Sequence, residues 1–286
     1  MKIGYVFTNY NNSAFTEAAV RSIAHGRDWS ESSVVIVDNQ SERIERDLLA
    51  ELEKTFPRIH IIYNEMNIGY FPGLNIGIDH LRLTDPGIEY TVIGNNDLVF
   101  PEDFTEKIAA NRDVFEKFPV ISPDLVTLDG MHQNPHVTRS ISRQRELIWD
   151  LYFLNYRLAT AIRWVAKVTK PFTERKDYGD HGTAQPIYQG YGACYILGPV
   201  FFRLFKRLWA PTFLMGEEFY LAKQLETKSF QTYYCPGILV HHHDHATMDK
   251  VPNRKLWEIS RESHKVYRKY VRPLRIRMMA PVTLSE

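Results

Sequence analysis

Three groups of polar residues in this 286-residue chain are of the types that bind metal ions or move protons. Asn95-Asn96-Asp97 follows an apolar run, Glu217-Glu218 places two carboxylates side by side, and His241–His243 are adjacent imidazoles. Carboxylate oxygens and imidazole nitrogens are common ligands of divalent metals, and a carboxylate can also accept a proton. Because side chains on a strand alternate between its two faces, one or two of the three histidines at most can face one ion.

Each group also has an interpretation without chemistry. Asp97 can be a turn residue ahead of Pro101, although its place at the end of a strand favours a site. Glu217-Glu218 precedes a helical apolar pattern, and acids are favoured at helix N-termini. The histidine run, extended by His245, is also compatible with a surface cluster or a Zn²⁺ site.

The first 120 residues position these groups, because apolar strands alternate there with helical patterns. Such alternation predicts a mostly parallel sheet with helices on both faces, an α/β fold. We predict strands over 2–8, 34–37, 59–63, 90–93 and 120–121, and helices over 13–25, 44–52, 74–83 and 102–117.

The carboxyl ends of four predicted strands are polar. In open parallel sheets ligands bind beyond these ends, so four polar ends in succession favour a shared ligand crevice over four unrelated turns. No glycine-rich phosphate loop follows the first strand, and a divalent metal held by Asp97 would neutralise phosphate charge instead. The polar ends are Thr8-Asn9-Tyr10-Asn11, Asp38-Asn39, Asn64 and Asn95-Asn96-Asp97.

Composition limits the function classes. The formal charge is only +1, but residues 139–176 carry nine Lys/Arg against three acids, and residues 254–277 carry nine against two. Such basic segments suit nucleic acid, anionic lipid or a phosphorylated substrate, and the lack of an RNA-module motif disfavours nucleic acid. Cys194 and Cys235 form no metal or disulfide pattern, which fits a reducing compartment, so we expect a cytoplasmic protein. The first apolar run is too short for a signal peptide, and no apolar run is long enough to span a membrane.

The basic segments contain helical patterns of their own. Residues 146–168 predict one helix of about 34 Å with an apolar and an aromatic stripe. It is either a helix buried against the sheet or an interfacial helix on a lipid surface. Residues 254–277 predict a basic helix, which either closes the domain as a solvated surface or approaches an anionic leaflet.

Several motifs together resemble family 2 glycosyltransferases of the GT-A fold, and most of all bacterial capsule and O-antigen sugar transferases. The resemblance covers roughly residues 1–250, as a nucleotide-binding half (1–120) and an acceptor and catalytic half (121–250) with a helical insertion near 140–176. Residues 251–286 follow as a basic helical tail. The motifs are VFTNYN (6–11), VVIVDNQS (34–41), NIGYFPGLNIGI (67–78), IGNND (93–97), GYGACYILG (190–198), GEEFYLAKQL (216–225) and VHHHDHATM (240–248).

The resemblance implies transfer of a sugar, with inversion, from a nucleoside diphosphate to a hydroxyl of a glycan or lipid-linked glycan. Thr8 and Asp38 match positions that hold the nucleobase, which by analogy favours UDP, with dTDP as the rival. Asn95 replaces the first acid of an Asp-x-Asp metal motif and adds no negative charge. The resemblance implies a contact of Asn95 with the ribose instead. The implied donor-binding residues are Thr8, Asn9, Tyr10, Asp38, Asn67, Gly69, Asn75, Asn95 and Asn96.

The resemblance also implies the catalytic roles. Asp97 and His242 would bind the metal, with His241 and His243 as rivals of His242. Mixed oxygen and nitrogen ligands favour Mn²⁺ over Mg²⁺. Glu218 would be the general base, and Glu217 is the alternative. Asp129, Gln133 and Asn134 are further candidates for the donor side that the sequence does not rank.

Two other functions compete with this one. A sugar nucleotidyltransferase would need a glycine-rich basic loop after the first strand, and TNYNNS does not supply it. A non-catalytic nucleotide-sugar or glycan-binding homologue is favoured by Asn95, whereas a binder would need no base such as Glu218. For the enzyme we expect a cytoplasmic location, peripheral on the inner face of the membrane, where a lipid-linked acceptor and anionic lipids are the partners.

Overall fold

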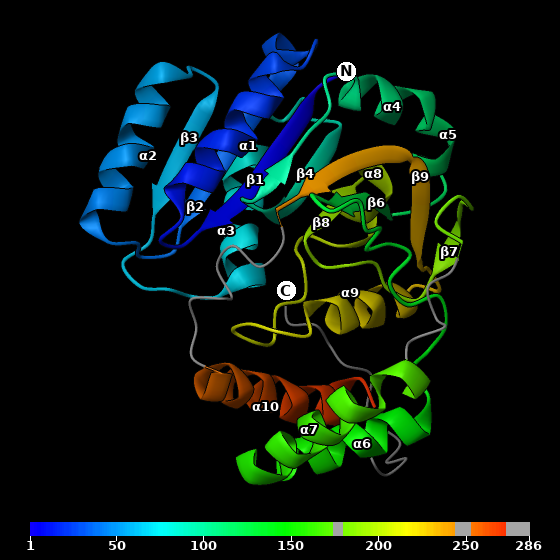
Figure 1. Cartoon of the computed structure of the whole chain (residues 1–286). Helices are drawn as coiled ribbons and strands as arrows, with labels where there is room; N and C mark the ends of the chain where they lie inside the picture. Colours follow the sequence, from blue (N-terminus) through cyan, green and yellow to red (C-terminus); the bar gives the residue numbers. More distant parts are fainter. Residues whose placement is uncertain (174–179, 244–252, 273–286) are drawn as a thin grey trace.

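The computed structural model describes residues 1–173, 180–243 and 253–272, and its first part alternates strand and helix as predicted (Figure 1). Valine- and isoleucine-rich runs form the strands, and residues with helical apolar spacing form the helices between them. The elements are β1 (Ile3–Asn9), α1 (Ser13–His25), η1 (Trp29–Glu31), β2 (Ser32–Asp38), α2 (Arg43–Thr55), β3 (Ile59–Tyr63), α3 (Tyr70–Thr84) and β4 (Tyr90–Asn95).

The second part adds short strands and three helices that lie away from the sheet (Figure 1). Its elements are β5 (Leu98–Val99), α4 (Phe104–Ala110), α5 (Arg112–Phe115), β6 (Val120–Thr127), α6 (Arg143–Leu154), α7 (Tyr156–Thr173), β7 (Gln185–Ile187), β8 (Cys194–Leu197), α8 (Pro199–Leu204), α9 (Glu217–Glu226), β9 (Thr232–His242) and α10 (Asn253–Tyr270).

One mixed sheet runs through the molecule in the order β3-β2-β1-β4-β8-β6-β9-β5, with β7 paired to β9. The first four strands are parallel, and β8 runs antiparallel to both β4 and β6. The predicted short strand at 120–121 continues to Thr127. The sequence did not predict this extension because Pro123 and Asp124, which disfavour strands, lie within it. The pairing of β6 with β9 shifts register between these two residues, and such an irregularity tolerates a proline that cannot donate a hydrogen bond.

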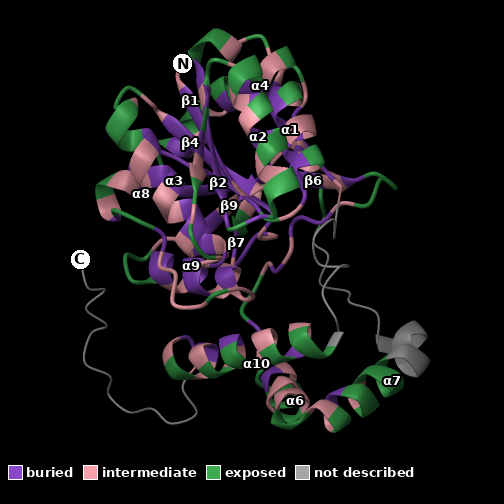
Figure 2. Cartoon of the chain, turned by 90° about the vertical axis from the view of Figure 1, so that its left-hand side faces the viewer, coloured by how far each residue is buried: buried purple, intermediate pink, exposed green. Residues whose placement is uncertain are grey.

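Helices cover both faces of the sheet, as expected for the predicted α/β class. On one face, Val20 and Ile23 of α1 and Leu49 of α2 pack against the strands. On the other face, Leu74 of α3 and Leu221 of α9 belong to a second apolar cluster. Figure 2 shows the strands buried between these helices. The result is the GT-A type of architecture, with the sheet edge at the carboxyl ends of β1, β2 and β4 left to form a site.

Helices α6, α7 and α10 form a layer of their own beyond α9 (Figures 1 and 2). The predicted single helix over 146–168 is wrong, because the chain turns at Asn155, whose backbone is extended (φ −156°, ψ 158°). The side-chain oxygen of Asn155 accepts a hydrogen bond from the Leu158 amide at 2.9 Å, which starts α7 as an N-cap does. Within the described residues, none of the helices is both long and apolar enough to cross a membrane.

Helix α10, the described part of the predicted basic tail, packs on this insertion. In α10, Arg268 forms an ion pair with Asp150 of α6, and the Tyr267 hydroxyl donates to Glu146 of α6 at 2.5 Å. Arg261 donates to the Phe153 carbonyl at 3.0 Å. The insertion and the described part of the tail therefore form one helical layer. The remainder of the tail, 251–252 and 273–286, lies outside the described residues.

Candidate active site

The polar ends of the parallel strands meet at one edge of the sheet, as predicted. The register pairs Asn9 of β1 with Asp38 of β2, and Thr8 of β1 with Asn95 of β4. Asp97 follows two residues after the end of β4. The side chains at this edge nevertheless fall into two groups, one closed into hydrogen bonds of the fold and one not.

Asn9 is the centre of the closed group and is fully buried. Its amide nitrogen donates to Asp38 and to Ser41, both at 3.0 Å, and its oxygen accepts from Thr16 at 2.8 Å and from Asn96 at 3.0 Å. Asn96, 4% exposed, also donates to Thr16 at 2.7 Å. These bonds use the polar atoms of Asn9 and Asn96 within the fold, and their contact with a donor nucleotide stays a prediction.

Asp38 belongs to the same closed group. Its carboxylate is fully buried and pairs with Arg46 of α2 at 2.7 Å, while its second oxygen accepts from Asn9. The Ser41 amide adds a bond at 3.1 Å. Asp38 therefore ties β2 to α2, and its predicted contact with a nucleobase stays a prediction.

Asn75 of α3 pairs with the backbone of Leu208. Its amide nitrogen donates to the Leu208 carbonyl and its oxygen accepts from the Leu208 amide, both at 2.9 Å. A side chain that pairs twice with one backbone residue anchors that loop to α3. No local pattern predicts this contact, because the partner lies 133 residues away, and the expected place of Asn75 beside the nucleotide stays a prediction.

The rim of the crevice holds the other predicted donor-side residues. Thr8 and Asn95 are half-buried neighbours, and Tyr10 is 42% exposed. Asn67 accepts a hydrogen bond from the Gly69 amide at 3.0 Å.

Gly69, which precedes α3, cannot be replaced by a residue with a side chain. Its φ of 97° lies in the region that glycine favours, and a Cβ there would collide with the Phe213 carbonyl oxygen. The Tyr70 amide donates to the same carbonyl at 3.0 Å. Gly69 therefore lets the loop ahead of α9 lie directly against the start of α3.

Asp97 and His242 meet as predicted in the second group. Strand β9 brings His242 opposite Leu98 of β5, and the His243 amide donates to the Asp97 carbonyl at 2.9 Å. His242 Nε2 then lies 3.3 Å from Asp97 Oδ1, with both side chains almost fully buried. Among the described residues, Asp97 Oδ1 accepts no hydrogen bond. His243 packs its ring on Phe15 instead, and His245 lies outside the described residues.

Gln133 orients the imidazole, a role that the sequence did not rank. Its side-chain oxygen lies 2.7 Å from His242 Nδ1. An amide oxygen can only accept, so Nδ1 donates its proton to Gln133, and Nε2 faces Asp97. Metal-binding histidines are commonly held by such a bond on the other ring nitrogen.

The pair fits a divalent cation as a partial ligand set. A buried carboxylate oxygen and an imidazole nitrogen are both suitable ligands. A cation between Asp97 and His242 would supply the partner that the Asp97 oxygen lacks among the described residues. No group of three or more His, Cys, Asp or Glu side chains gathers within the described ranges. A cation bound by these two residues therefore needs further ligands from a substrate or from water.

Glu217 and Glu218 begin α9 after Gly216, whose φ is 84°. Glu217 is 6% exposed, and its Oε1 has no hydrogen-bond partner among the described residues. Glu218 is half-buried and lies against the Gly192 backbone. Burial raises the pKa of both carboxyls, and the Glu218 charge raises the pKa of Glu217 further. Raised carboxyl pKa values beside a crevice are typical of groups that transfer protons.

Tyr70 and the loop at Gly192 connect the two clusters. The Tyr70 hydroxyl donates to the Gly192 carbonyl at 2.9 Å, and the Asn95 amide donates to the Ala193 carbonyl at 2.9 Å. Burial first, and then nearby charges that include Glu217, Glu218 and Asp97, raise the pKa of Tyr70. The sequence did not single out Tyr70, which joins α3 to the Gly192 loop.

The same architecture occurs in solved glycosyltransferase structures. TarS of S. aureus is 11% identical with a TM-score of 0.55, covering 85% of this chain and 36% of TarS. GalNAc-T7 with UDP, GalNAc and Mn²⁺ is 12% identical with a TM-score of 0.54, covering 85% and 44%. The mannosyltransferase PcManGT of Pyrobaculum calidifontis, in complex with GDP-Man and Mn²⁺, is 14% identical with a TM-score of 0.54, covering 93% and 62%. At such identities the likeness shows the GT-A fold alone, and this chain spans less than two thirds of each of these chains.

A family model also matches part of the sequence. Residues 6–147, just under half of the chain, match the model of glycosyl transferase family 2. This range runs from β1 into α6 and includes the strand ends and Asp97. None of the curated protein sequences matches the chain.

Proposed function

We propose that the protein is an inverting glycosyltransferase that moves a sugar from a nucleoside diphosphate to a hydroxyl of a glycan or lipid-linked glycan in surface polysaccharide biosynthesis. The reaction would take place in the cytoplasm, peripheral to the inner face of the membrane. One observation carries the proposal: Glu218 lies against Gly192, and the adjacent Ala193 carbonyl accepts a hydrogen bond from Asn95 at the strand end that leads to the Asp97–His242 pair. The Asp97–His242 pair suits a diphosphate, and the Glu217–Glu218 pair suits an acceptor hydroxyl.

The reaction needs one base and one stabilised leaving group. The acceptor oxygen forms a bond to the anomeric carbon while the bond from that carbon to the phosphate oxygen breaks. The nucleoside diphosphate leaves with the bonding electrons, and the hydroxyl proton passes to a Glu218 carboxylate oxygen. Glu218 is the better candidate than Glu217 because its side chain is partly exposed. A raised pKa makes its carboxylate a stronger proton acceptor.

Asp97 and His242 are the proposed metal ligands, and the donor diphosphate would supply further oxygens. A cation bound there acts as a Lewis acid on the phosphate charge. The mixed oxygen and nitrogen set favours Mn²⁺, with Mg²⁺ as the alternative. The presence of Mn²⁺ with nucleotides in GalNAc-T7 and PcManGT supports this choice.

For donor binding we propose a division between two kinds of residue. Thr8, Tyr10 and Asn95 contact the nucleoside from the exposed rim, with Asn67 and Gly69 shaping the loop beside it. The buried Asn9, Asp38 and Asn96 and the half-buried Asn75 hold the backbone in place. UDP remains the proposed nucleotide, with dTDP as the rival.

A panel of nucleoside diphosphate sugars with Mn²⁺ tests this function. Slow release of nucleoside diphosphate, dependent on the cation, is the expected result. Binding of a donor without turnover, even with acceptors present, would favour the non-catalytic binding homologue. The uncharged Asn95 is the sequence feature that favours this alternative. Chemistry that depends on pyrophosphate would favour the nucleotidyltransferase.

A further inference from the structure

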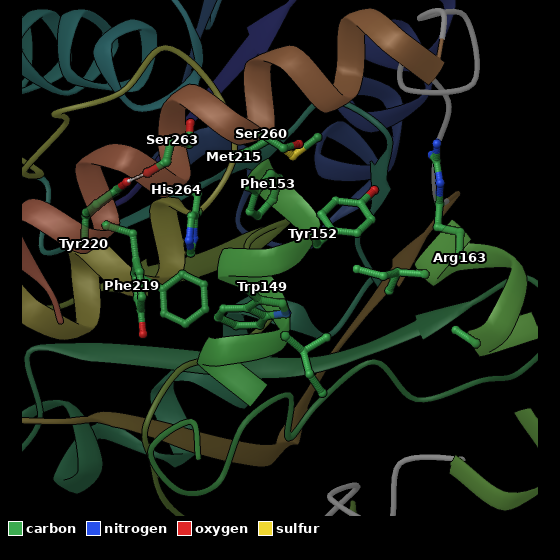
Figure 3. A pocket seen from close by; sticks show the side chains of 15 residues that line it. Trp149, Tyr152, Phe153, Arg163, Met215, Phe219, Tyr220, Ser260, Ser263 and His264 are labelled. Carbon is green, nitrogen blue, oxygen red and sulfur yellow. Dashed lines mark hydrogen bonds between the residues drawn. The ribbon is translucent and has the colours of Figure 1, made fainter. Parts of the chain in front are cut away.

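An apolar cavity of about 410 Å³ lies between α9 and the helical layer (Figure 3). Trp149 and Phe153 of α6, Ile162 of α7, Phe219 of α9 and Tyr267 of α10 contribute to its walls. Its volume falls within the range of small-molecule binding sites. Neither the sequence motifs nor the proposed transfer reaction assigns it a ligand.

Five of the polar side chains that line the cavity are bonded within the protein. The Tyr220 hydroxyl donates to the Ser263 carbonyl at 2.8 Å, as drawn in Figure 3, and the Ser263 hydroxyl donates to the Leu214 carbonyl at 2.5 Å. The other such bonds join Ser260 to Leu256, His264 to Asp150 and Tyr267 to Glu146. Most of the surface that remains for a ligand is aromatic and aliphatic, and such a site selects a largely apolar group.

One end of the cavity lies at the start of α9. Met215, Gly216 and Phe219 line it. Glu217 and Glu218 stand between these lining residues in the chain, although their own side chains do not line the cavity. The cavity and the two carboxylates therefore share the first turn of α9.

The outer surface of the same layer is both apolar and basic. The exposed apolar residues on α6 and α7 are Leu147, Ile148, Leu151, Leu154, Trp164 and Val165, and Ile148 also lines the cavity. Over residues 139–166 and 254–272 the chain has twelve Lys/Arg against four acids. Exposed apolar side chains among cations complement the hydrocarbon and the anionic headgroups of a membrane surface.

From this arrangement we propose that the cavity binds the hydrocarbon chain of a lipid acceptor and presents the acceptor hydroxyl to Glu218. The exposed face of α6 and α7 takes the chain from an anionic membrane, and the walls of the cavity fix its position. This inference rests on the proposed glycosyl transfer and adds to it a subsite for the apolar part of the acceptor.

Calorimetric titration of the full-length protein with primary alcohols from hexan-1-ol to dodecan-1-ol tests the cavity, because their hydroxyl stands for that of the acceptor. Each added methylene that enters the cavity strengthens binding about four-fold. The affinity then reaches a plateau once the cavity is full, whereas unspecific partition onto an apolar surface keeps rising with length. A series without that plateau, or no binding at any length, overturns the proposal.

Two alanines of α7 give a matched pair of variants. Ala166 lines the cavity, whereas Ala161, also exposed on α7, does not. Ala166→Phe takes up volume comparable to a few methylenes, so dodecan-1-ol should bind about 60-fold more weakly. Ala161→Phe should bind it as the unmodified protein does. Equal binding by both variants contradicts the proposal, and Ser260→Phe on α10 repeats the test from another wall.

Donor turnover separates this inference from the proposed function. Hydrolysis of a nucleotide sugar needs the strand-end site and not the cavity, so Ala166→Phe should retain it. If the protein hydrolyses a donor but binds no alcohol, the lipid subsite fails and the transferase stands. If it binds alcohols with the plateau but turns over no donor, the transferase fails and the cavity remains an apolar binding site.

Discussion

Two groups of buried polar side chains lie at the same edge of the sheet and differ in how their polar atoms are satisfied. Around Asn9 and Asp38, hydrogen bonds join β1, β2, α1 and α2 into a closed network. At Asp97 and Glu217, a buried carboxylate oxygen accepts no hydrogen bond within the described residues. Both groups look alike in the sequence, as Asn and Asp or Glu beside apolar runs.

We infer from this difference that the Asn9–Asp38 group supports the fold, whereas Asp97 and Glu217 are available for chemistry. A buried polar atom without a partner costs about 1–3 kcal/mol of folding free energy, so a fold that keeps two such atoms needs a reason. A ligand that supplies the missing partners is such a reason. The closed network has nothing left to offer a ligand, and its value lies in holding the strand ends still.

The largest effect should come from Glu218→Gln. Loss of the base should lower turnover about 10²–10⁴-fold while donor affinity stays nearly unchanged, because the amide keeps the shape but cannot accept the proton. Steady-state kinetics and donor titration measure the two quantities. Glu226→Gln, at the exposed end of α9, is the control. Unchanged turnover in Glu218→Gln would remove this residue from the base role.

Asp38→Ala should act on stability and not on chemistry. It leaves Arg46 and Asn9 without their buried partner, and breaking such a pair costs about 3 kcal/mol in the free energy of unfolding. Asp47→Ala is the control, because its contact with Arg43 is exposed and 3.9 Å long and should contribute almost nothing. Denaturant unfolding that finds the two variants equally stable would break the distinction between the groups.

Gln133→Ala should weaken Mn²⁺ binding about 10–100-fold, the usual effect of removing the partner of a metal-binding histidine. The imidazole of His242 would lose the bond that fixes its proton on Nδ1. Gln133→Glu restores an acceptor oxygen and should recover most of the affinity. A Gln133→Ala variant with unaltered Mn²⁺ affinity would show that His242 is not held for metal binding.

Glu217→Gln should produce the smallest effect, a rise in thermal stability that depends on pH. Burial raises the folded-state pKa of Glu217 above its unfolded value, so this carboxyl contributes stability at low pH that is lost as pH rises through the raised pKa. The neutral amide escapes this loss. The melting temperature of the variant should therefore exceed that of the unmodified protein by a margin that grows from pH ~4 upward. A difference in melting temperature that does not change with pH would show that folding does not raise the pKa of Glu217.

The sequence revealed the strand ends because local signals mark them. Gly94 and Asn95 end an apolar run, and Asp97 follows at once, so alternation and turn preference were sufficient. The pairing of Asp97 with His242 was implied by the family resemblance and not by these local signals. The break at Asn155 was not predicted, since helical spacing continues on both sides and only the cap bond to Leu158 reveals the turn.

The remainder depends on contacts between distant segments. Gln133 reaches His242 across 109 residues, and Tyr70 reaches Gly192 across 122. No local pattern distinguishes a glutamine or a tyrosine that makes such a bond. For the same reason the sequence did not show two further contacts. Asn75 pairs with Leu208, and Asp38 pairs with Arg46.

The most direct test of the central claim, that the group at Asp97 is kept for a cation and its nucleotide, is Mn²⁺ binding measured by electron paramagnetic resonance with UDP present. The unmodified protein should bind Mn²⁺, and Asp97→Asn should lose at least about tenfold in affinity while remaining folded. Asp47→Ala, on the exposed surface of α2, should bind as the unmodified protein does. Equal Mn²⁺ affinity in Asp97→Asn and the unmodified protein would contradict the account.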